Sequence, residues 1–307
     1  MQASASAEAF RKVHPREYYT RFTTQGVRPD GRALSASRAL SITPGAVGKA
    51  DGSAMVRLGD TTVLGTVRAE VTKAMPETLD SGRLAIKLVI TPLASPAVRA
   101  GRPNDAAAAI SNMLERIMTS SEAVRLQDLA VGDVAEGMVW ILYCDLYCLD
   151  YAGNVADAAL VALLAALQDT KLPTLEAGAE ESDELVVSDA PPRCLTLQHI
   201  PAPLSFAVVG LHIVADPTFE EECLGYGSAE VDAALLITGG GGGYGAIEVG
   251  ETYDSFTVVT DENQKLCGVH KPGGSALSEA QLRECVELAR ARSRHIASLL
   301  EGVVAPQ

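Results

Sequence analysis

The chain has 307 residues and a mass of 32.1 kDa, and its 25 Lys and Arg against 39 Asp and Glu give a net charge of −14. A hydrophobic content of 47% with 21% charged residues is typical of a globular protein and excludes a wholly disordered, collagen-like or disulfide-dense chain. The longest uninterrupted apolar run, residues 158–167, is shorter than the roughly 20 residues that cross a bilayer, so we expect no membrane partner. The acidic balance also argues against an autonomous nucleic-acid binder, so any RNA contact must be local.

The first residues and the cysteines point to a reducing environment. Residues 1–19 lack the apolar core of a secretory signal, so we expect the protein to stay where disulfides do not form. The six cysteines include no C-x-x-C pair, which argues against zinc. The even spacing of Cys144 and Cys148 in an apolar run places both on one face of a strand, as small core residues.

The first half opens with strand patterns. Residues 54–58 and 61–70 alternate on either side of Gly59-Asp60, which predicts a hairpin. Residues 85–91 and 137–149 predict two more strands. The second of these is almost continuously apolar and is therefore expected to lie inside a sheet.

Two helical patterns belong to the same half. From Ala106 onward, apolar residues recur at helical spacing. Residues 155–168 are apolar on nearly every side apart from Asp157, which predicts a buried helix.

An acidic break separates the two halves. Residues 176–189 contain six acids and no base and precede Pro191-Pro192, which predicts a linker or surface loop. Strand patterns then resume at residues 194–199, 205–216, 255–260 and 265–270. The final helix begins with a capping box at Ser278–Gln281 and carries an apolar stripe of Leu282, Val286, Ala289, Ile296 and Leu300.

Each half therefore runs strands first and helix last. The predicted fold class is α+β, with two similarly organised halves of β-sheet and helix. We divide the chain into an N-terminal arm (1–27), a first domain (28–172), an acidic linker (173–192) and a second domain (193–300). A Gly-rich insertion at residues 226–252 interrupts the second domain.

The glycine run within that insertion satisfies G-x-G-x-x-G through Gly240, Gly242 and Gly245. A dinucleotide site needs this motif to open a crossover helix, whereas the residues that follow resemble a strand, and no phosphate loop is present. A flexible insertion is the better interpretation.

The acids from Asp216 to Glu222 directly follow an apolar strand. Such acids can hold a divalent metal or act as acid and base, but a solvated acidic run after a strand is the simpler interpretation, because closeness in sequence does not show convergence in space. The histidines are dispersed and accompany no nucleophile, so a hydrolase triad has no support.

Two pairs of arginines could meet phosphates, since a guanidinium binds an oxyanion in bidentate fashion. Arg28 and Arg32 lie before the first strand, where a loop pinned by arginine–carboxylate bonds is the main interpretation. Arg99 and Arg102 lie on a Pro/Gly loop between a strand and a helix, where RNA contact and simple exposure are about equally supported.

Several segments, taken in order, resemble the RNase PH-like subunits that form the ring of the eukaryotic RNA exosome. The resemblance covers roughly residues 10–298 and omits the Gly-rich insertion. The segments that carry it are Phe10-Arg-Lys, Glu17 to Phe22, Arg28 to Arg32, Asp51 to Ala54, Leu58 to Thr62, Leu142 to Asp150, Ala158 to Leu167, Ser205 to Val208, Asp216-Pro-Thr and His270 to Ser275. Their order is more specific than any one of them.

The resemblance implies an RNase PH-like fold, of the type called ribosomal protein S5 domain 2-like, in both halves. Active members of the family cleave RNA from its 3′ end with inorganic phosphate, which they hold at the amino end of a helix beside a Gly-Ser/Thr-Arg turn. The corresponding turn here is Gly153-Asn154-Val155 and lacks the arginine.

The resemblance also indicates two further losses. Where active members carry arginines on the preceding helix, an approximate alignment places Asn112 and Glu115. Asp216 is retained, but Glu222 replaces the second acid of the metal motif. We therefore expect no catalytic residue, metal or cofactor, and we interpret Asn112, Glu115, Asn154, Val155, Asp216 and Glu222 as vestigial positions.

A non-catalytic subunit that builds the exosome barrel and channels RNA to a nuclease elsewhere in the complex is the implied function. The expected partners are another RNase PH-like subunit in a heterodimer within a six-subunit ring, RNA-binding cap subunits, an associated exoribonuclease and single-stranded RNA. The processes would be rRNA maturation and the turnover of mRNA and non-coding RNA, in the nucleus with its nucleolus and in the cytoplasm. The preferred candidates for RNA contact are Arg99 and Arg102, and Arg28 and Arg32 are the second choice.

Two alternatives remain open. The chain could be a phosphate-dependent exoribonuclease, with Asp216 and Glu222 on a metal and a partner chain lending the missing arginines. It could also be an unrelated α+β enzyme that binds a nucleotide at the glycine run.

Overall fold

The computed structural model describes residues 9–11, 13–74, 81–95, 98, 104–131, 137–177, 185–188, 190–224 and 254–304. Arg99, Arg102 and the Gly-rich insertion at 226–252 lie outside the described residues.

A five-stranded sheet with strand order β1-β2-β3-β5-β4 forms the first half. Its strands are β1 (Leu40–Pro44), β2 (Gly52–Leu58), β3 (Thr61–Lys73), β4 (Arg83–Ile90) and β5 (Met138–Asp150). The predicted hairpin is confirmed, because β2 and β3 pair antiparallel up to Leu58 and Thr61. Strand β5 is internal, as its apolar run predicts, with β3 antiparallel on one side and β4 parallel on the other. Cys144 and Cys148 are both buried on it.

Helix α3 (Asp105–Ser120) covers the outer edge of β4. Asn104 caps its amino end by accepting hydrogen bonds from the N–H groups of Ala106 and Ala107. The backbone N–H of Leu88 donates to Ser111 Oγ (2.8 Å), and that of Ile86 donates to Glu115 Oε1 (3.4 Å). The helix thus satisfies backbone donors of an edge strand that would otherwise be open to pairing.

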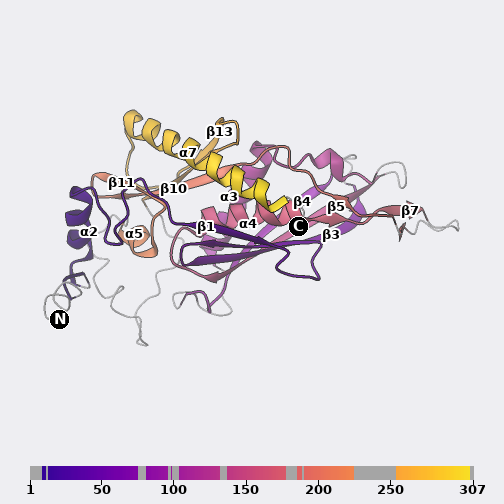
Figure 1. Cartoon of the computed structure of the whole chain (residues 1–307), viewed down its shortest axis with the longest axis horizontal. Helices are drawn as coiled ribbons and strands as arrows, with labels where there is room; N and C mark the ends of the chain where they lie inside the picture. Colours follow the sequence, from indigo (N-terminus) through magenta and orange to yellow (C-terminus); the bar gives the residue numbers. More distant parts are fainter. Residues whose placement is uncertain are drawn as a thin grey trace.

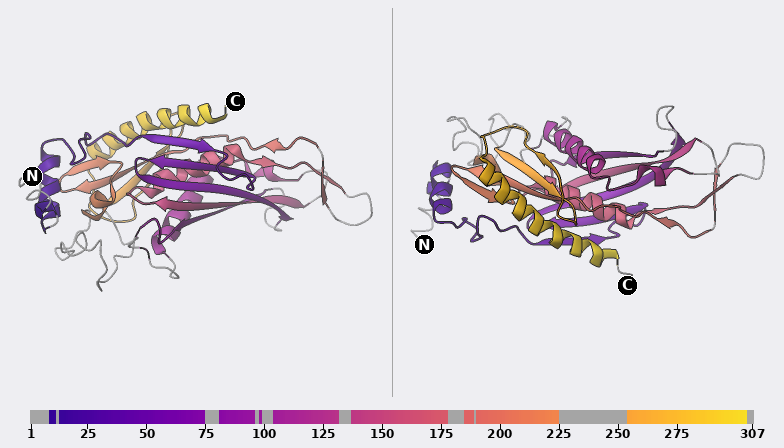
Figure 2. Two further views of the ribbon diagram at one scale, coloured as in Figure 1. Left: turned by 60° about the horizontal axis from the view of Figure 1, so that its bottom comes forward. Right: turned by 90° about the horizontal axis from the view of Figure 1, so that it is seen from above.

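The second half is a four-stranded antiparallel sheet with strand order β11-β10-β12-β13. Its strands are β10 (Ala202–Val209), β11 (His212–Ala215), β12 (Ser255–Thr260) and β13 (Leu266–His270). A short helix, α5 (Phe219–Leu224), follows β11, and the long helix α7 (Glu279–Val304) packs along β10 and β12 (Figures 1 and 2). The capping box is confirmed, because Ser278 and Gln281 exchange hydrogen bonds at the start of α7.

Helix α4 (Val155–Asp169) packs against both sheets. Every residue from Asp157 to Leu167 is buried, which explains why the helix is apolar on nearly every side. The core around α4 takes in Ala202 and Val259 from the second sheet and Ile296 and Leu300 from α7. The two halves therefore share one core.

One short strand pair lies within the range predicted as a linker, and another flanks it. Strand β6 (Lys171–Leu172) pairs with β9 (Arg193–Cys194), and β7 (Leu175–Ala177) pairs with β8 (Leu185–Val187). In Figure 1, β7 lies at one end of the long axis and α2 at the other. The range predicted as a linker therefore carries an ordered two-stranded arm.

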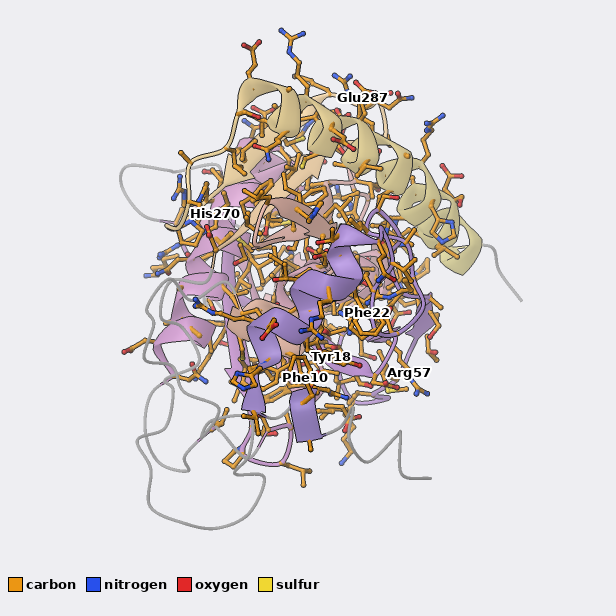
Figure 3. All side chains as sticks on the ribbon, turned by 90° about the vertical axis from the view of Figure 1, so that its left-hand side faces the viewer. Phe10, Tyr18, Phe22, Arg57, His270 and Glu287 are labelled. Carbon is orange, nitrogen blue, oxygen red and sulfur yellow. The ribbon has the colours of Figure 1, made fainter. Side chains whose placement is uncertain are left out.

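Helix α2 (Pro15–Thr24) lies within the predicted N-terminal arm and packs on the second half. Its Tyr19 is buried in a small cluster with Val209, Val214 and Leu224. Figure 3 shows Tyr18 and Phe22 on this helix, with ring centroids 4.9 Å apart. None of the helices in the described ranges is both long enough and apolar enough to cross a bilayer.

The shared core generates the first prediction. Leu164→Ala, at a fully buried position of α4, should lower the free energy of unfolding by about 2–5 kcal/mol, because it leaves a cavity between the sheets. The matched control is Leu211→Ala, since that side chain is 90% exposed, and it should change stability by less than about 0.5 kcal/mol. Urea unfolding of both variants measures the difference, and similar losses would contradict the packing described.

Candidate functional site

The turn that opens α4 meets the turn that follows β11. Gly153 has a left-handed φ of +93°, and a Cβ built there would lie 2.3 Å from the backbone nitrogen of Phe219 and 2.5 Å from the carbonyl carbon of Thr218. The Phe219 N–H donates to the carbonyl of Ala152 (3.0 Å). Only glycine permits this approach, which brings α5 against the amino end of α4.

Asp216 is the centre of the polar network at this junction. Its side chain is 1% exposed and its φ is +48°. Arg38 donates to its carboxylate from Nη2 (2.7 Å), Nε (3.0 Å) and the backbone N–H (2.6 Å), and Asn154 Nδ2 donates to Oδ1 (2.7 Å). Burial opposes ionisation of Asp216, but the hydrogen bonds and charge of Arg38 outweigh it and hold the pKa below its usual value.

Asn154 and Asp157 extend the network into the second sheet. Asn154 Nδ2 also donates to Asp157 Oδ2 (2.8 Å). The Asp157 carboxylate accepts the backbone N–H of Ser205 (3.0 Å) and its Oγ–H (2.6 Å), and Ser205 Oγ lies 2.8 Å from Thr257 Oγ1. Burial raises the pKa of Asp157 despite these bonds. Asp157, the one acid within the buried stretch of α4, thus joins the two halves.

Glu222 approaches the same helix end from α5. Its Oε1 accepts the backbone N–H of Asn154 (2.8 Å), and its Oε2 accepts the hydroxyl of Tyr151 (2.9 Å). Burial raises the pKa of Glu222 to about 7, and the two hydrogen bonds only partly offset this effect. The carboxyl group of Glu222 therefore occupies the amino end of α4 and is about half ionised near pH 7.

Each acid of the Glu220-Glu221-Glu222 run has its own partner. Glu220 accepts hydrogen bonds from Arg11 and Tyr19, and Glu221 is buried in an ion pair with Arg28. The interpretation of this run as a solvated surface segment is therefore wrong, because the run fastens α5 to three separate elements.

A cavity of ≈ 160 Å³ lies beside this end of α4. Among the described residues, its lining contains no arginine or lysine. The largely apolar lining includes Ala106, Ala109, Ile110 and Met113 of α3, Val155 of α4 and Phe256 of β12, with His270 and Glu222 among the polar members.

Asn112 and Glu115, which are predicted as vestigial positions, do not line this cavity. The α3 residues that line the cavity recur at helical spacing from Ala106 to Met113, and neither predicted position belongs to that face. Asn112 is exposed, and Glu115 accepts the backbone N–H of Ile86 on β4.

Arg28 and Arg32 are structural. The Arg28 side chain is fully buried, pairs with Glu221 and donates to the carbonyls of Ala215 (2.7 Å) and Asp216 (3.0 Å). Arg32 pairs with Asp30 (2.6 Å) and Asp216 (3.3 Å). The pinned-loop interpretation is confirmed. The assignment of Arg28 to RNA is wrong because its guanidinium is fully buried, whereas Arg32 keeps its Nη2 without a hydrogen-bond partner among the described residues and its RNA contact stays a prediction. Arg99 and Arg102 fall outside the described residues.

Four residues of the network are not predicted as site residues from the sequence: Arg38, Tyr151, Asp157 and Ser205. Asp157 gives a signal, since it is the one acid within the apolar stretch 155–168. No sequence pattern marks Arg38 as a site residue, because its partner, Asp216, lies 178 positions away in the sequence.

Metal binding at Asp216 and Glu222 is opposed by their hydrogen bonds. The Asp216 carboxylate already accepts from Arg38, Arg32 and Asn154, and a bound cation would lie next to two guanidinium groups. Among the described residues, His199, Asp261 and Glu262 have ligand atoms within 4.8 Å of one another, and this group includes neither acid of the site.

Comparison with protein families gives two matches. Residues 36–173 match the model of the 3′ exoribonuclease family, domain 1, and residues 251–292 match domain 2 of the same family, RNase PH.

Individual relatives match most of the chain. "Exosome complex component Rrp42" of Thermococcus gammatolerans is 32% identical over 79% of this chain and 89% of its own length. "Exosome complex component rrp43" of Schizosaccharomyces pombe is 27% identical over 95% of this chain and 97% of its own length.

Solved structures agree with the sequence matches. A chain of the Archaeoglobus fulgidus exosome with RNA bound to the active site superposes with a TM-score of 0.73 at 29% identity, covering 92% of this chain and 96% of that one. A chain of an archaeal exosome core gives 0.70 at 25% identity, covering 98% and 100%. The predicted α+β, RNase PH-like fold is confirmed.

The Asp216 network generates the second prediction. Arg38→Met should lower the free energy of unfolding by about 3–5 kcal/mol at pH 7, because it leaves a buried carboxylate without its main counter-charge. Adding Asp216→Asn should restore much of the loss, and a urea double-mutant cycle measures the coupling. A single variant that loses less than about 1 kcal/mol would contradict the central role of this pair.

Glu222 generates the third prediction. Because its pKa is raised from 4.5 to about 7, its contribution to stability is complete below pH 4.5 and is lost as the pH rises through 7. Glu222→Gln should therefore raise the free energy of unfolding at pH 8 by about 1–2 kcal/mol, allowing for partial exposure, and change it little at pH 4.5. Urea titrations at both pH values measure this, and an equal effect at both would refute a raised pKa.

Proposed function

The chain belongs to the 3′ exoribonuclease (RNase PH) family, and from this premise we propose that it is a non-catalytic structural and RNA-channelling subunit of an RNA exosome ring. Relatives that carry the name exosome complex component match it over most of their length, which supports the assignment to this complex. In this role it supports 3′-to-5′ processing and degradation of RNA by a nuclease elsewhere in the complex.

One observation carries the non-catalytic role: the amino end of α4 holds a carboxylate. In active members of the family this helix end is expected to hold the attacking phosphate beside an arginine. Here Glu222 accepts the Asn154 N–H, and the adjacent cavity has no arginine or lysine in its described lining. A phosphate placed there would have to compete with the Glu222 side chain for the Asn154 N–H, and it would face a like charge whenever Glu222 is ionised.

The proposed partners follow from the ring assignment. We place the chain in a heterodimer with another RNase PH-like subunit, within a ring of six that also carries RNA-binding cap subunits and an associated exoribonuclease. Head-to-tail contacts between related subunits close such a ring. The substrates are single-stranded RNAs of rRNA maturation and of mRNA and non-coding RNA turnover, in the nucleus with its nucleolus and in the cytoplasm.

The division into domains at 28–172 and 193–300 belongs to this proposal, with α4 as the element that both domains bury. RNA contact is proposed for Arg99 and Arg102 first and for Arg32 behind them, since Arg28 is fully buried in its ion pair with Glu221. With a net charge of −14, such contact is confined to a local basic loop, and the rest of the surface discourages stray RNA.

The direct test is the native mass and subunit composition of the complex that contains this chain in its own cells. A hetero-oligomeric ring with other RNase PH-like chains and a separate nuclease is the expected result. A monomer or homo-oligomer that releases nucleoside diphosphates only when phosphate is added, and loses this activity in Asp216→Asn, would overturn the proposal in favour of a phosphorolytic enzyme.

The fourth prediction concerns RNA passage. Arg99→Glu combined with Arg102→Glu should weaken protection of single-stranded RNA by the assembled ring, because two phosphate contacts become repulsive. The mass of the ring should stay unchanged. Nuclease footprinting at fixed salt measures protection, and equal protection by the variant ring would refute the RNA contact at this loop.

A further inference from the structure

We propose, building on the ring assignment above, that one face of the first sheet is the surface on which the second RNase PH-like subunit docks. We call this face, which lies opposite α4, the open sheet face. It is defined by Met55, Leu64, Val89 and Tyr147 with the flanking Arg57 and Lys87. The partner surface that fits it has an apolar centre with carboxylates beside it.

The first sheet has one buried face and one face that is accessible to solvent. Successive side chains of a strand point to opposite faces. On β2, the residues at 54, 56 and 58 are buried under α4, whereas Met55 and Arg57 between them are exposed. Strands β3 and β5 show the same alternation of buried and partly exposed residues. Within the described ranges, the core therefore closes on one face of the sheet and leaves the other accessible.

An apolar row crosses β2, β3, β5 and β4 on the open sheet face. Met55 on β2 pairs in register with Leu64 on β3, and Leu64 pairs with Tyr147 on β5. Tyr147 in turn pairs with Val89 on β4. Paired residues share a face, so these side chains are neighbours, and Met55 and Tyr147 remain 38% and 37% exposed. A contiguous exposed apolar row of this kind is typical of a surface that another macromolecule covers.

The size of the open sheet face suits a stable interface. Four strands about 4.8 Å apart, with about seven residues each at about 3.3 Å per residue, give a projected area of about 450 Å². The accessible area of a pleated surface exceeds its projection, which brings it toward the roughly 800 Å² that each partner buries in a standard interface. Contact through the face rather than the edge fits the fold, because Ser111 and Glu115 of α3 already accept N–H groups of β4.

The charges beside the apolar row indicate an acidic partner surface. Arg57 and Lys87 are exposed on opposite sides of the row. Asp145, next to Lys87, is paired with Arg68 at 3.5 Å. Arg57 lies 3.6 Å from Asp60, so three bases face two acids here, in a chain whose net charge is −14. A second copy docked through the same face would bring like charges together, whereas carboxylates of a different subunit would be attracted.

Single-stranded RNA fits the open sheet face less well than a protein does. An RNA platform needs aromatic rings on which successive bases stack. The Arg68 guanidinium already lies over the ring of Tyr143, 5.8 Å from its centroid. Asp145 separates Tyr143 from Tyr147 along β5, and a carboxylate between the two rings would repel phosphate. A protein surface is therefore the better occupant.

The test recovers the complex from its own cells with the tagged full-length wild type and with the double variant Met55→Lys/Tyr147→Lys. Both side chains are more than a third exposed, so the fold should tolerate the change, and unchanged urea midpoints of the isolated chains verify this. The amount of at least one RNase PH-like partner per tagged chain should fall about tenfold, because two charges enter an apolar interface. Quantitative mass spectrometry of the recovered complexes measures this ratio.

Two further variant pairs make the result specific. Leu211→Lys/Leu266→Lys is the matched control, because it adds the same charge at exposed apolar side chains of the second half, and it should leave partner recovery unchanged. Arg57→Glu/Lys87→Glu tests the flanking charges and should lower recovery about threefold at low salt. This loss should shrink between about 0.1 M and about 1 M potassium chloride, because the Debye length falls from about 10 Å to about 3 Å.

Several outcomes would overturn the inference. Wild-type recovery by both variant pairs on the open sheet face would show that the partner docks elsewhere. An equal loss in the control pair would show a general effect of added charge. If Met55→Lys/Tyr147→Lys does not fold, Arg57→Glu/Lys87→Glu decides, because both of its side chains are exposed.

Other results would assign the open sheet face to a different occupant. A homodimer of the isolated chain that Met55→Lys/Tyr147→Lys separates would make a second copy the occupant. Variant rings of normal mass that lose protection of single-stranded RNA would make RNA the occupant. A wild type that recovers no RNase PH-like chain would overturn the ring assignment itself, so that failure is distinguishable from a failure of the open sheet face alone.

Discussion

The burial of α4 between two sheets is the constraint on which the rest of the structure depends. When a helix is buried among apolar side chains, the unpaired N–H groups of its first turn lie at the edge of the core. Those N–H groups require hydrogen-bond acceptors. The Asn154 side chain accepts the Asp157 N–H, and Glu222 from the second half accepts the Asn154 N–H, because β10 packs on one side of α4 and α5 closes over its first turn. The shared core and the polar network at Asp216 are thus two consequences of one packing arrangement.

Charge compensation explains the form that this network takes. Asp157, Asp216 and Glu221 are nearly excluded from solvent, and ionised groups in such places need counter-charges or several hydrogen bonds. Arg28 and Arg38 supply the counter-charges, and Asn154 bridges two of the acids. Residues that could serve phosphorolysis in a related protein are here committed to holding the two halves together, which suits a subunit whose proposed role is architecture.

Sequence patterns anticipated the elements better than the site. The hairpin at Gly59-Asp60, the internal strand at 138–150 and the buried helix at 155–169 follow from local periodicity, because each pattern records which faces are buried. The sequence did not show that Asn112 and Glu115 lie away from the cavity beside α4, because the direction of a helix face depends on which neighbour the helix packs against. The acidic run at 220–222 looked solvated because its partners are distant in sequence.

By itself the sequence determined the α+β class, the family resemblance, the absence of an arginine at Asn154-Val155 and the structural interpretation of Arg28 and Arg32. Only the tertiary structure decided that Glu222 caps the amino end of α4 and that Arg38 neutralises Asp216. The physical reason is the distance along the sequence over which each interaction acts. Periodicity and turn chemistry act over a few residues, whereas these hydrogen bonds join atoms about 70 and 180 positions apart and exist only once both sheets close on one helix.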